Sequence, residues 1–392
     1  MLYLGIDISK YNHVATLIDS QANPLFKGFS FANTVEGGES LAAVLAKHIK
    51  SPADLEIGME ATGHYWLSLY SFLVAKGYAV HVINPIQTDG WRKGVEIRKR
   101  KTDKIDSFLI ADLLRYGDFV ETSLSDENVM SLRNLSRFRH YLVGSIGDLK
   151  RKAICILDQT FPEYQGVFSD TFGQTSSELL LHFQSAEDFA SITAQQLETA
   201  LAGITRKSFA KNKLTQISEL AANSFGLKFC KDSFSLQLKL LIEQMRFIEA
   251  QVSDVEAEIE GLLTKLGSPI TTVPGVGAVT GAAILSEIGD ISRFPNPSKL
   301  VAFSGIDATV IQSGESSGSY KMSKRGSPYL RKALFQAALV ASNNDPVFKA
   351  YYQKKRSEGK HHLTALGAVA RKLCYTIHAI LKNNTPYVVQ TT

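Results

Sequence analysis

Two long runs of apolar residues at heptad spacing constrain the fold of this chain more than any other feature. The first is interrupted by Arg139 and runs through Leu132, Leu135, Leu142, Ile146, Leu149, Ala153 and Ile156. The second runs in steps of four and three through Leu241, Met245, Ile248, Val252, Val255, Ile259, Leu262 and Leu266. Apolar residues at this spacing form a seam that one long helix buries against another. The pattern predicts two coiled-coil arms, which pair either with each other as a hairpin or with another subunit.

The N-terminal 120 residues follow a different pattern, in which strands and helices alternate. The segments LYLGIDI and HVATLID are typical of a hairpin, and DLEIGME and AVHVINP are typical of buried strands. A helix is expected between the last two, capped by Thr62 and ended by Gly77. Its apolar face would contain Trp66, Leu69, Tyr70, Leu73 and Val74. The overall prediction is an α/β domain followed by mostly helical regions.

Charge and cysteine content narrow the possible functions. The 392 residues carry a formal net charge of +5, and basic side chains gather at residues 91–101 and 318–332. This sorting favours an anionic partner such as nucleic acid. Cys155, Cys230 and Cys374 have no metal-ligand spacing, so we expect reduced thiols in a cytoplasmic protein without zinc. No run approaches 18 apolar residues, and no contact with a membrane is expected.

The segment RKRKTDKIDS, residues 98–107, places a basic run directly beside two carboxylates. Asp103 and Asp106 lie in the first turn of a helix expected to begin near Thr102, with Ile105, Leu109, Leu113 and Tyr116 as its buried stripe. Asp7 and Glu60 lie on two predicted strands. If the four acids converge, a divalent cation must offset their repulsion, and Mg²⁺ or Mn²⁺ suits carboxylates together with phosphate oxygens. The expected backbone contacts nearby are Arg92, Lys93, Arg98, Lys99, Arg100 and Lys101.

Each of these residues also has an ordinary structural explanation. Aspartates in the first turn of a helix favour the helix dipole in any protein. Glu60 is compatible with a solvated strand end, and a basic run is more often a solvated face than a binding site. Asp7 is harder to explain in this way, because aspartate is uncommon within strands.

The C-terminal region from residue 267 carries an independent signal. TTVPGVGAVTGAAILSEIGD is typical of a helix-hairpin-helix unit, in which Gly275 and Gly277 would leave backbone N–H groups open to a phosphate. An ordinary turn between two helices is the alternative. Further along, a Ser/Gly loop is followed by Lys321, Lys324, Arg325, Arg331 and Lys332. The loop is either a site for a serine nucleophile or a flexible connection.

Eight ordered motifs resemble one known family. GIDISK, GMEATGHY, RKTDKID, VPGVG, DISRFPNPSKLVAFSGI, QSG, SKRGSPYLRKAL and ALGAVARKLCYTI are similar to motifs of the DEDD transposases of the IS110 group of bacterial insertion sequences, relatives of the Piv invertases. The resemblance implies a RuvC-like (RNase H-type) domain with Asp7, Glu60, Asp103 and Asp106 as catalytic metal ligands. It also implies a nucleophilic serine, which by motif match is Ser313. Ser316 and Ser317 are the backup candidates, because they lie close to it in the same loop.

The resemblance further implies partners and a domain plan. The partners are donor and target DNA, a non-coding bridge RNA that selects sequence, and other copies of the chain in a dimer or tetramer associated with the bacterial nucleoid. The expected domains are residues 1–120, a coiled-coil region at 121–266 and a transposase domain at 267–392. Three alternatives stay open: a Holliday-junction resolvase, a non-catalytic nucleic-acid-binding scaffold, and a sugar-kinase or actin-like ATPase. In the last class Gly and Thr or Ser cradle phosphates after the strand, whereas here Ile8, Ser9 and Lys10 follow it.

Overall fold

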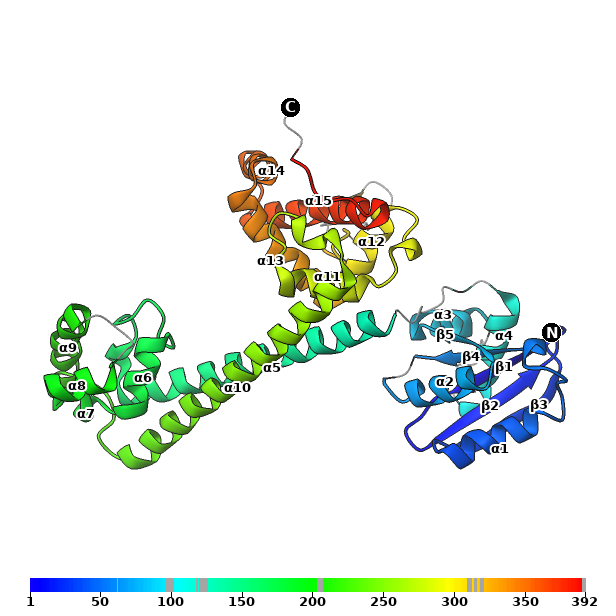
Figure 1. Cartoon of the computed structure of the whole chain (residues 1–392), viewed down its shortest axis with the longest axis horizontal. Helices are drawn as coiled ribbons and strands as arrows, with labels where there is room; N and C mark the ends of the chain where they lie inside the picture. Colours follow the sequence, from blue (N-terminus) through cyan, green and yellow to red (C-terminus); the bar gives the residue numbers. More distant parts are fainter. Residues whose placement is uncertain are drawn as a thin grey trace. The chain divides into compact units, whose positions relative to one another are not determined.

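The computed structural model describes residues 1–61, 63–95, 102–117, 119, 126–202, 207–308, 312–313, 316–317 and 321–389. For residues 207–212, 214, 312–313 and 316–317 it describes the backbone alone. The chain divides into two compact units, Met1–Leu124 and Ser125–Thr392. The first is a mixed α/β unit and the second is mostly helical (Figure 1), as the sequence predicts.

The N-terminal unit is built on one five-stranded sheet in the order β3-β2-β1-β4-β5. Its strands are β1 (Leu2–Asp7), β2 (Asn12–Ile18), β3 (Pro24–Ala32), β4 (Leu55–Glu60) and β5 (Ala79–Ile83). β1, β2 and β3 pair antiparallel, which confirms the predicted hairpin, whereas β1, β4 and β5 run parallel. The parallel register sets Gly5 beside Gly58 and Ile6 beside Met59, so that Asp7 and Glu60 end adjacent strands.

Four α-helices and one 3₁₀ turn accompany the sheet in the described residues of this unit. They are α1 (Val35–Leu45), the turn η1 (Pro52–Asp54), α2 (Trp66–Ala75), α3 (Pro85–Val95) and α4 (Asp103–Tyr116). Leu4 and Ile6 of β1 pack into a core with the apolar residues of α1 and α2. Gly5, between them, faces α4, because side chains of a strand alternate between the two faces of a sheet. A Cβ at Gly5 would lie 2.1 Å from the carbonyl oxygen of Ser107. Helix α4 therefore rests directly on the backbone of β1.

Two helix predictions in this unit hold in part. Helix α4 begins as expected, with the Thr102 side chain accepting a hydrogen bond from the Ile105 N–H. Its expected stripe is wrong at Tyr116, which is 61% exposed, because Ile110 and Leu114 face the sheet instead. Helix α2 ends near Gly77 as predicted, but it begins at Trp66 without a side-chain cap. Thr62, the expected cap, lies outside the described residues.

The helical unit begins with a long antiparallel pair, α5 (Glu127–Thr160) and α10 (Lys231–Leu266). The two helices lie side by side within one chain (Figure 1). The buried residues of the predicted seam are Leu132, Leu142, Ala153, Ile156, Met245, Ile259 and Leu262. Arg139, which interrupts the seam, donates to Glu256 of α10 at 2.6 Å. The pairing of the arms as a hairpin is therefore the arrangement within the chain.

A small helical subdomain joins the far ends of this pair. It comprises the 3₁₀ turn η2 (Pro162–Tyr164), α6 (Gln174–His182), α7 (Ala186–Ala190), α8 (Ala194–Ala200) and α9 (Lys207–Ala222). Its core is aromatic, with Phe161, Tyr164 and Phe189 in mutual ring contact. These residues have their own apolar centre, which fixes the ends of α5 and α10.

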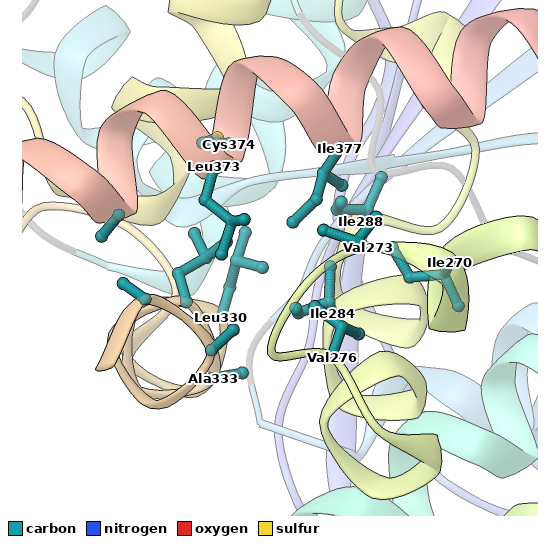
Figure 2. Packing of buried hydrophobic residues seen from close by; sticks show 14 of the residues in the cluster. Ile270, Val273, Val276, Ile284, Ile288, Leu330, Ala333, Leu373, Cys374 and Ile377 are labelled. Carbon is teal, nitrogen blue, oxygen red and sulfur yellow. The ribbon is translucent and has the colours of Figure 1, made fainter. Parts of the chain in front are cut away.

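The C-terminal residues form a second helical cluster, whose elements follow in order along the chain. They are η3 (Pro269–Thr272), α11 (Ala278–Ile288), η4 (Ile291–Arg293), α12 (Pro297–Ser304), the two-residue strands β6 (Gln312–Ser313) and β7 (Ser316–Ser317), α13 (Pro328–Asn344), α14 (Pro346–Ser357) and α15 (His362–Asn383). Figure 2 shows Ile284 of α11, Leu330 of α13 and Leu373 of α15 meeting in the core of this cluster. Burial raises the pKa of the Cys374 thiol to about 12, which makes it an unreactive core residue. The division into three domains stays a prediction.

Within the described ranges, no helix is both long and apolar enough to cross a membrane.

Candidate active site

Two of the four predicted acids lie at one edge of the N-terminal sheet. Asp7 is the last residue of β1 and Glu60 the last residue of β4, and these strands are parallel neighbours. Both residues are partly exposed. The carboxyl ends of parallel strands form the edge of a sheet at which ligands bind in α/β proteins. The fold thus brings these two carboxylates together at an accessible edge.

The other two acids begin helix α4. Asp103 is its exposed first residue, whereas Asp106, one turn later, is only 7% exposed. Both lie near the helix N-terminus, where the dipole favours negative charge. The next residue, Ser107, lies against Gly5 of β1, two residues before Asp7. A buried hydrogen bond of 2.8 Å between the Ser107 and Thr16 hydroxyls also holds this turn on the sheet.

Helix α3 links the sheet edge to helix α4, a role that sequence reasoning missed. The Thr88 hydroxyl donates to Oε2 of Glu60 at 2.6 Å, and Nη2 of Arg92 lies 2.9 Å from Oδ1 of Asp106. Thr88 and Arg92 are four residues apart and so share one face of the helix. One helical face therefore positions two of the four acids. Thr88 carried no sequence signal beyond its place in a helix that follows a strand.

The basic run expected beside the acids is only partly described. Arg92 faces Asp106, with 19% of its side chain exposed. Lys93 is 75% exposed and pairs with Asp89 at 2.6 Å. Residues 98–101, the remainder of the run, lie outside the described residues. Contact of these side chains with nucleic acid stays a prediction.

The four acids have the oxygen ligands that a divalent metal ion prefers, but they are not gathered into one group. Asp7 and Glu60 supply the oxygen ligands that Mg²⁺ prefers, at adjacent strand ends. Asp106 is held by Arg92. Among the residues that the structure describes, no three His, Cys, Asp or Glu side chains are grouped closely enough to hold one ion. Asp7 and Glu60 are thus the part of the predicted ligand set that is already side by side.

The predicted nucleophile lies in a small hairpin of the helical unit. The backbone of Ser313, in β6, pairs antiparallel with that of Ser316 in β7. At the base of this hairpin, Ala308 and Met322 form a further antiparallel bridge. Ser304, by contrast, is fully buried and donates to the Val301 carbonyl at 2.7 Å. Of these two serines, only Ser313 belongs to the pair of short strands β6 and β7.

A groove opens beside the base of this hairpin and contains cations that sequence reasoning missed. It has a volume of about 700 Å³ and is lined by residues flanking the hairpin and by α14 and α15: Ile306, Ala308, Lys321, Met322, Tyr351, Leu363, Thr364, Gly367, Ala368, Arg371, Lys372 and Tyr375. The Lys372 ammonium lies over the Tyr351 ring at 4.9 Å. Hydrogen bonds from Ser298 and then from Arg371 lower the pKa of Tyr375. The sequence signal that could have indicated these cations is the spacing of Arg371, Lys372 and Tyr375 in ALGAVARKLCYTI, which places them on one side of a helix.

The remaining predicted basic residues surround the α12–α13 connection. Lys324 and Arg325 are exposed, and Lys324 has a positive φ of 54°. Nη1 of Arg331 donates to the Ser304 carbonyl at 3.2 Å, which ties α13 to the end of α12. Lys332 is exposed on α13. Contact of Lys324 and Arg325 with nucleic acid stays a prediction, and Arg331 has a structural contact within the chain.

The glycine turn before α11 packs tightly against α13. Gly275 has a φ of 79°, and a Cβ there would lie 2.2 Å from the carbonyl oxygen of Ala337. Gly277 is the N-cap of α11, and no side chain caps this end. Gly275 is therefore required for the close packing of α13, which fits the alternative of an ordinary turn between two helices. Gly277 leaves the N-terminus of α11 without a side-chain cap, as a phosphate contact would need.

Comparison with known proteins identifies the relatives of these two units. A family model described as a transposase, of the IS110 DEDD type, matches residues 4–162, and one described as "Transposase IS116/IS110/IS902 family" matches residues 267–353. The chain belongs to the IS110 family of transposases. The first match contains all four predicted acids of this transposase, and the second contains Ser313, Gly275 and Gly277.

Relatives of this transposase align over nearly the whole chain. It is 25% identical to the uncharacterized 44.8 kDa protein of insertion element IS116 from Streptomyces clavuligerus, over 100% of this chain and 98% of the relative. It is 26% identical to the 42 kDa protein of IS900 from Mycobacterium paratuberculosis, with the same coverage. The pilin gene-inverting protein of Moraxella bovis is 24% identical over 98% of this chain and 97% of its own length.

Proposed function

We propose that this chain is a metal-dependent DNA recombinase that excises and inserts an insertion sequence under the guidance of a bridge RNA. The observation that carries the proposal is the pair Asp7 and Glu60 at the ends of adjacent parallel strands. Helix α3 contacts both Glu60 and Asp106, which supports a common site for the acids. A mixed five-stranded sheet with carboxylates at its edge also supports a RuvC-like (RNase H-type) domain.

The residues that would hold Mg²⁺ or Mn²⁺ are Asp7 and Glu60 together with Asp103 and Asp106. A bound divalent cation would stabilise the negative charge that develops on the transferring phosphoryl group. Thr88 orients Glu60, because its hydroxyl donates a hydrogen bond of 2.6 Å to one carboxylate oxygen, Oε2. Arg92 neutralises Asp106 while the carboxylate is buried.

The covalent step belongs to Ser313. Its hydroxyl oxygen forms a bond to a DNA phosphorus, and the bond from that phosphorus to one deoxyribose oxygen breaks. The serine proton leaves, and the departing strand oxygen takes up a proton, so one phosphodiester replaces another and the DNA can be rejoined by the reverse step. A hairpin position for Ser313, beside a groove with three cations, supports this role.

DNA backbone contact is proposed for both basic regions of the chain. In the helical unit, Lys321, Arg371 and Lys372 line the groove beside the serine hairpin, where their charges suit phosphate oxygens. The uncapped end of α11 at Gly277 offers backbone N–H groups to a further phosphate. In the N-terminal unit, the run through residues 98–101 would hold the strand that the acids cleave.

Subunit assembly is proposed through the paired helices α5 and α10, acting as a coiled coil. Their mutual seam leaves large apolar side chains exposed: Phe138 is 47%, Tyr141 65% and Phe247 66% exposed. Exposed aromatic residues on a long helical pair are typical of a surface that binds another protein. The resulting dimer or tetramer should be visible as a multiple of the chain mass in light scattering coupled to size-exclusion chromatography.

The test of the metal site uses amide variants of the four acids. Asp7→Asn, Glu60→Gln, Asp103→Asn and Asp106→Asn should each abolish strand cleavage and leave DNA binding intact, because each removes a ligand charge and no phosphate contact. Mg²⁺ or Mn²⁺ should be required. The matched control is Asp89→Asn, an exposed carboxylate on α3, which should cleave normally. Full cleavage in the presence of a chelator would refute the metal assignment.

RNA guidance is tested by sequencing the RNA that copurifies with the protein. One abundant species with segments complementary to donor and target DNA is the expected result. Cleavage of branched DNA without any RNA, giving free 5′-phosphate ends, would instead indicate a Holliday-junction resolvase.

A further inference from the structure

A second cavity lies in the helical unit, between α5, α11 and α13. Its volume is about 310 Å³, at the lower end of the range for small-ligand sites. It shares no lining residue with the groove beside the serine hairpin. Its polar wall includes Ser136, Arg137, His140, Tyr329, Lys332 and Gln336.

The charges in this cavity leave one cation without a carboxylate partner. Arg137 donates to both carboxylate oxygens of Glu287, at 2.7 and 3.1 Å, and Arg139 pairs with Glu256. Within the described part of the chain, the partner of the Lys332 ammonium is Nδ1 of His140, 3.3 Å away. Burial, and then the charges of Lys332 and Arg139, lower the pKa of His140, so its ring is neutral near pH 7. The cavity therefore presents one net positive charge, which suits a single anion.

An aromatic surface and an unsatisfied hydroxyl complete the cavity. The Tyr329 ring is held by the Arg137 guanidinium, 4.8 Å from its centroid, and by the His140 ring, edge-on at 5.1 Å. The Ser136 hydroxyl oxygen is buried and has no hydrogen-bond partner among the described residues. Leaving such a group unsatisfied costs stability, because it loses its hydrogen bonds to water and gains none in the protein. A ligand with a polar edge would satisfy it.

We propose that this cavity binds one unpaired nucleotide of the single-stranded nucleic acid that the proposed function requires. The ligand combines the features to which the walls are matched: a planar ring for Tyr329, a polar edge for Ser136 and Gln336, and one phosphate for Lys332. A double helix is too wide for a cavity of this volume, so the nucleotide must be unpaired. RNA and DNA both supply this chemistry, and the experiment distinguishes them.

The experiment measures binding of the intact protein to fluorescent 12-nucleotide single strands by anisotropy. Tyr329→Leu should weaken binding about tenfold, the effect of losing one aromatic contact to a base. On a strand whose bases are all replaced by abasic sites, the same variant should bind as the wild type does. Lys332→Gln should weaken binding to both strands and lower the salt slope by about 0.7. The matched control, Lys349→Gln, alters an exposed lysine of α14 outside the cavity.

Ser136→Ala keeps the experiment informative if Tyr329→Leu disturbs folding, because it removes only the buried hydroxyl. It should leave thermal stability unchanged or higher and still weaken binding to the base-containing strand. RNA and DNA oligonucleotides of the same sequence show which nucleic acid supplies the nucleotide: it is the one whose binding the cavity variants weaken. Equal losses for Tyr329→Leu on base-containing and abasic strands, or for Lys332→Gln and Lys349→Gln, would overturn the proposal. If the wild type binds no single strand, the proposed function itself fails.

Discussion

Replacing Arg92 with glutamine should destabilise the N-terminal unit, because it removes the ion pair between Arg92 and the buried Asp106 carboxylate. The two side chains are 19% and 9% exposed, and their charged atoms are 2.9 Å apart. Removing one partner of a buried pair costs about 3–5 kcal/mol. We expect about 3 kcal/mol here, since Arg92 keeps some contact with water. With a urea m value of about 2 kcal/mol/M, the unfolding midpoint would fall by about 1.5 M.

The chain itself supplies the assay for this prediction. Its two tryptophans, Trp66 and Trp91, both lie in the N-terminal unit, so tryptophan fluorescence follows the unfolding of this unit alone. The matched control is Lys93→Gln on the same helix. Lys93 and its partner Asp89 are 75% and 53% exposed, and an exposed pair of this kind contributes about 0.5 kcal/mol or less.

The same variants separate a structural role for Arg92 from direct contact with DNA. If Arg92 positions Asp106, Arg92→Gln should lower stability and leave the salt dependence of duplex binding unchanged. If Arg92 instead neutralises a phosphate, the slope of log affinity against log salt should fall by about 0.9. Equal stability of the Arg92→Gln and Lys93→Gln proteins would refute the reasoning from the ion pair.

Three further predictions concern other parts of the structure. Gly5→Ala should destabilise the N-terminal unit by about 3 kcal/mol, because its Cβ would overlap the α4 backbone, whereas Gly90→Ala in open space on α3 should be neutral or stabilising; urea midpoints test both. Burial lowers the pKa of His13, so the unfolded chain binds the proton more readily and stability should fall as the pH drops below about 6.5. This loss should be smaller in His13→Gln. Arg371→Gln and Lys372→Gln should each lower the salt slope of DNA binding by about 0.9, and an unchanged slope would remove the groove from the DNA-binding surface.

The parts of the fold that the sequence predicted are those in which apolar residues repeat at a regular spacing. Leu132 and Ile259 repeat at heptad spacing and are buried in the helical pair. The pairing itself was open, because a heptad seam is equally suited to a helix of the same chain or of another. Tyr116 was misplaced because an apolar stripe does not show where a helix leaves its sheet, and this ring packs on Trp91 instead.

For the candidate site, the sequence predicts which acids take part, but not the side-chain contacts that hold Glu60 and Asp106 in place. Asp7 and Glu60 follow from their strand ends, since parallel neighbours end at one edge. The role of Thr88 depends on the tertiary packing that brings α3 to Glu60, which no local pattern encodes. Arg92 looked like part of a basic surface, because its neighbours in sequence are basic, although its partner in space is Asp106. Arg371 and Lys372 join the serine hairpin only through tertiary packing.

The most direct test of the central claim is to trap the reaction on suicide DNA and map any covalent adduct by mass spectrometry. The wild type with Mg²⁺ should carry a phosphodiester on Ser313. Ser313→Ala and Glu60→Gln should carry none, while Ser304→Ala and Ser319→Ala should react almost normally. An adduct on a residue outside the 313–319 loop, or strand transfer without any adduct, would contradict the account.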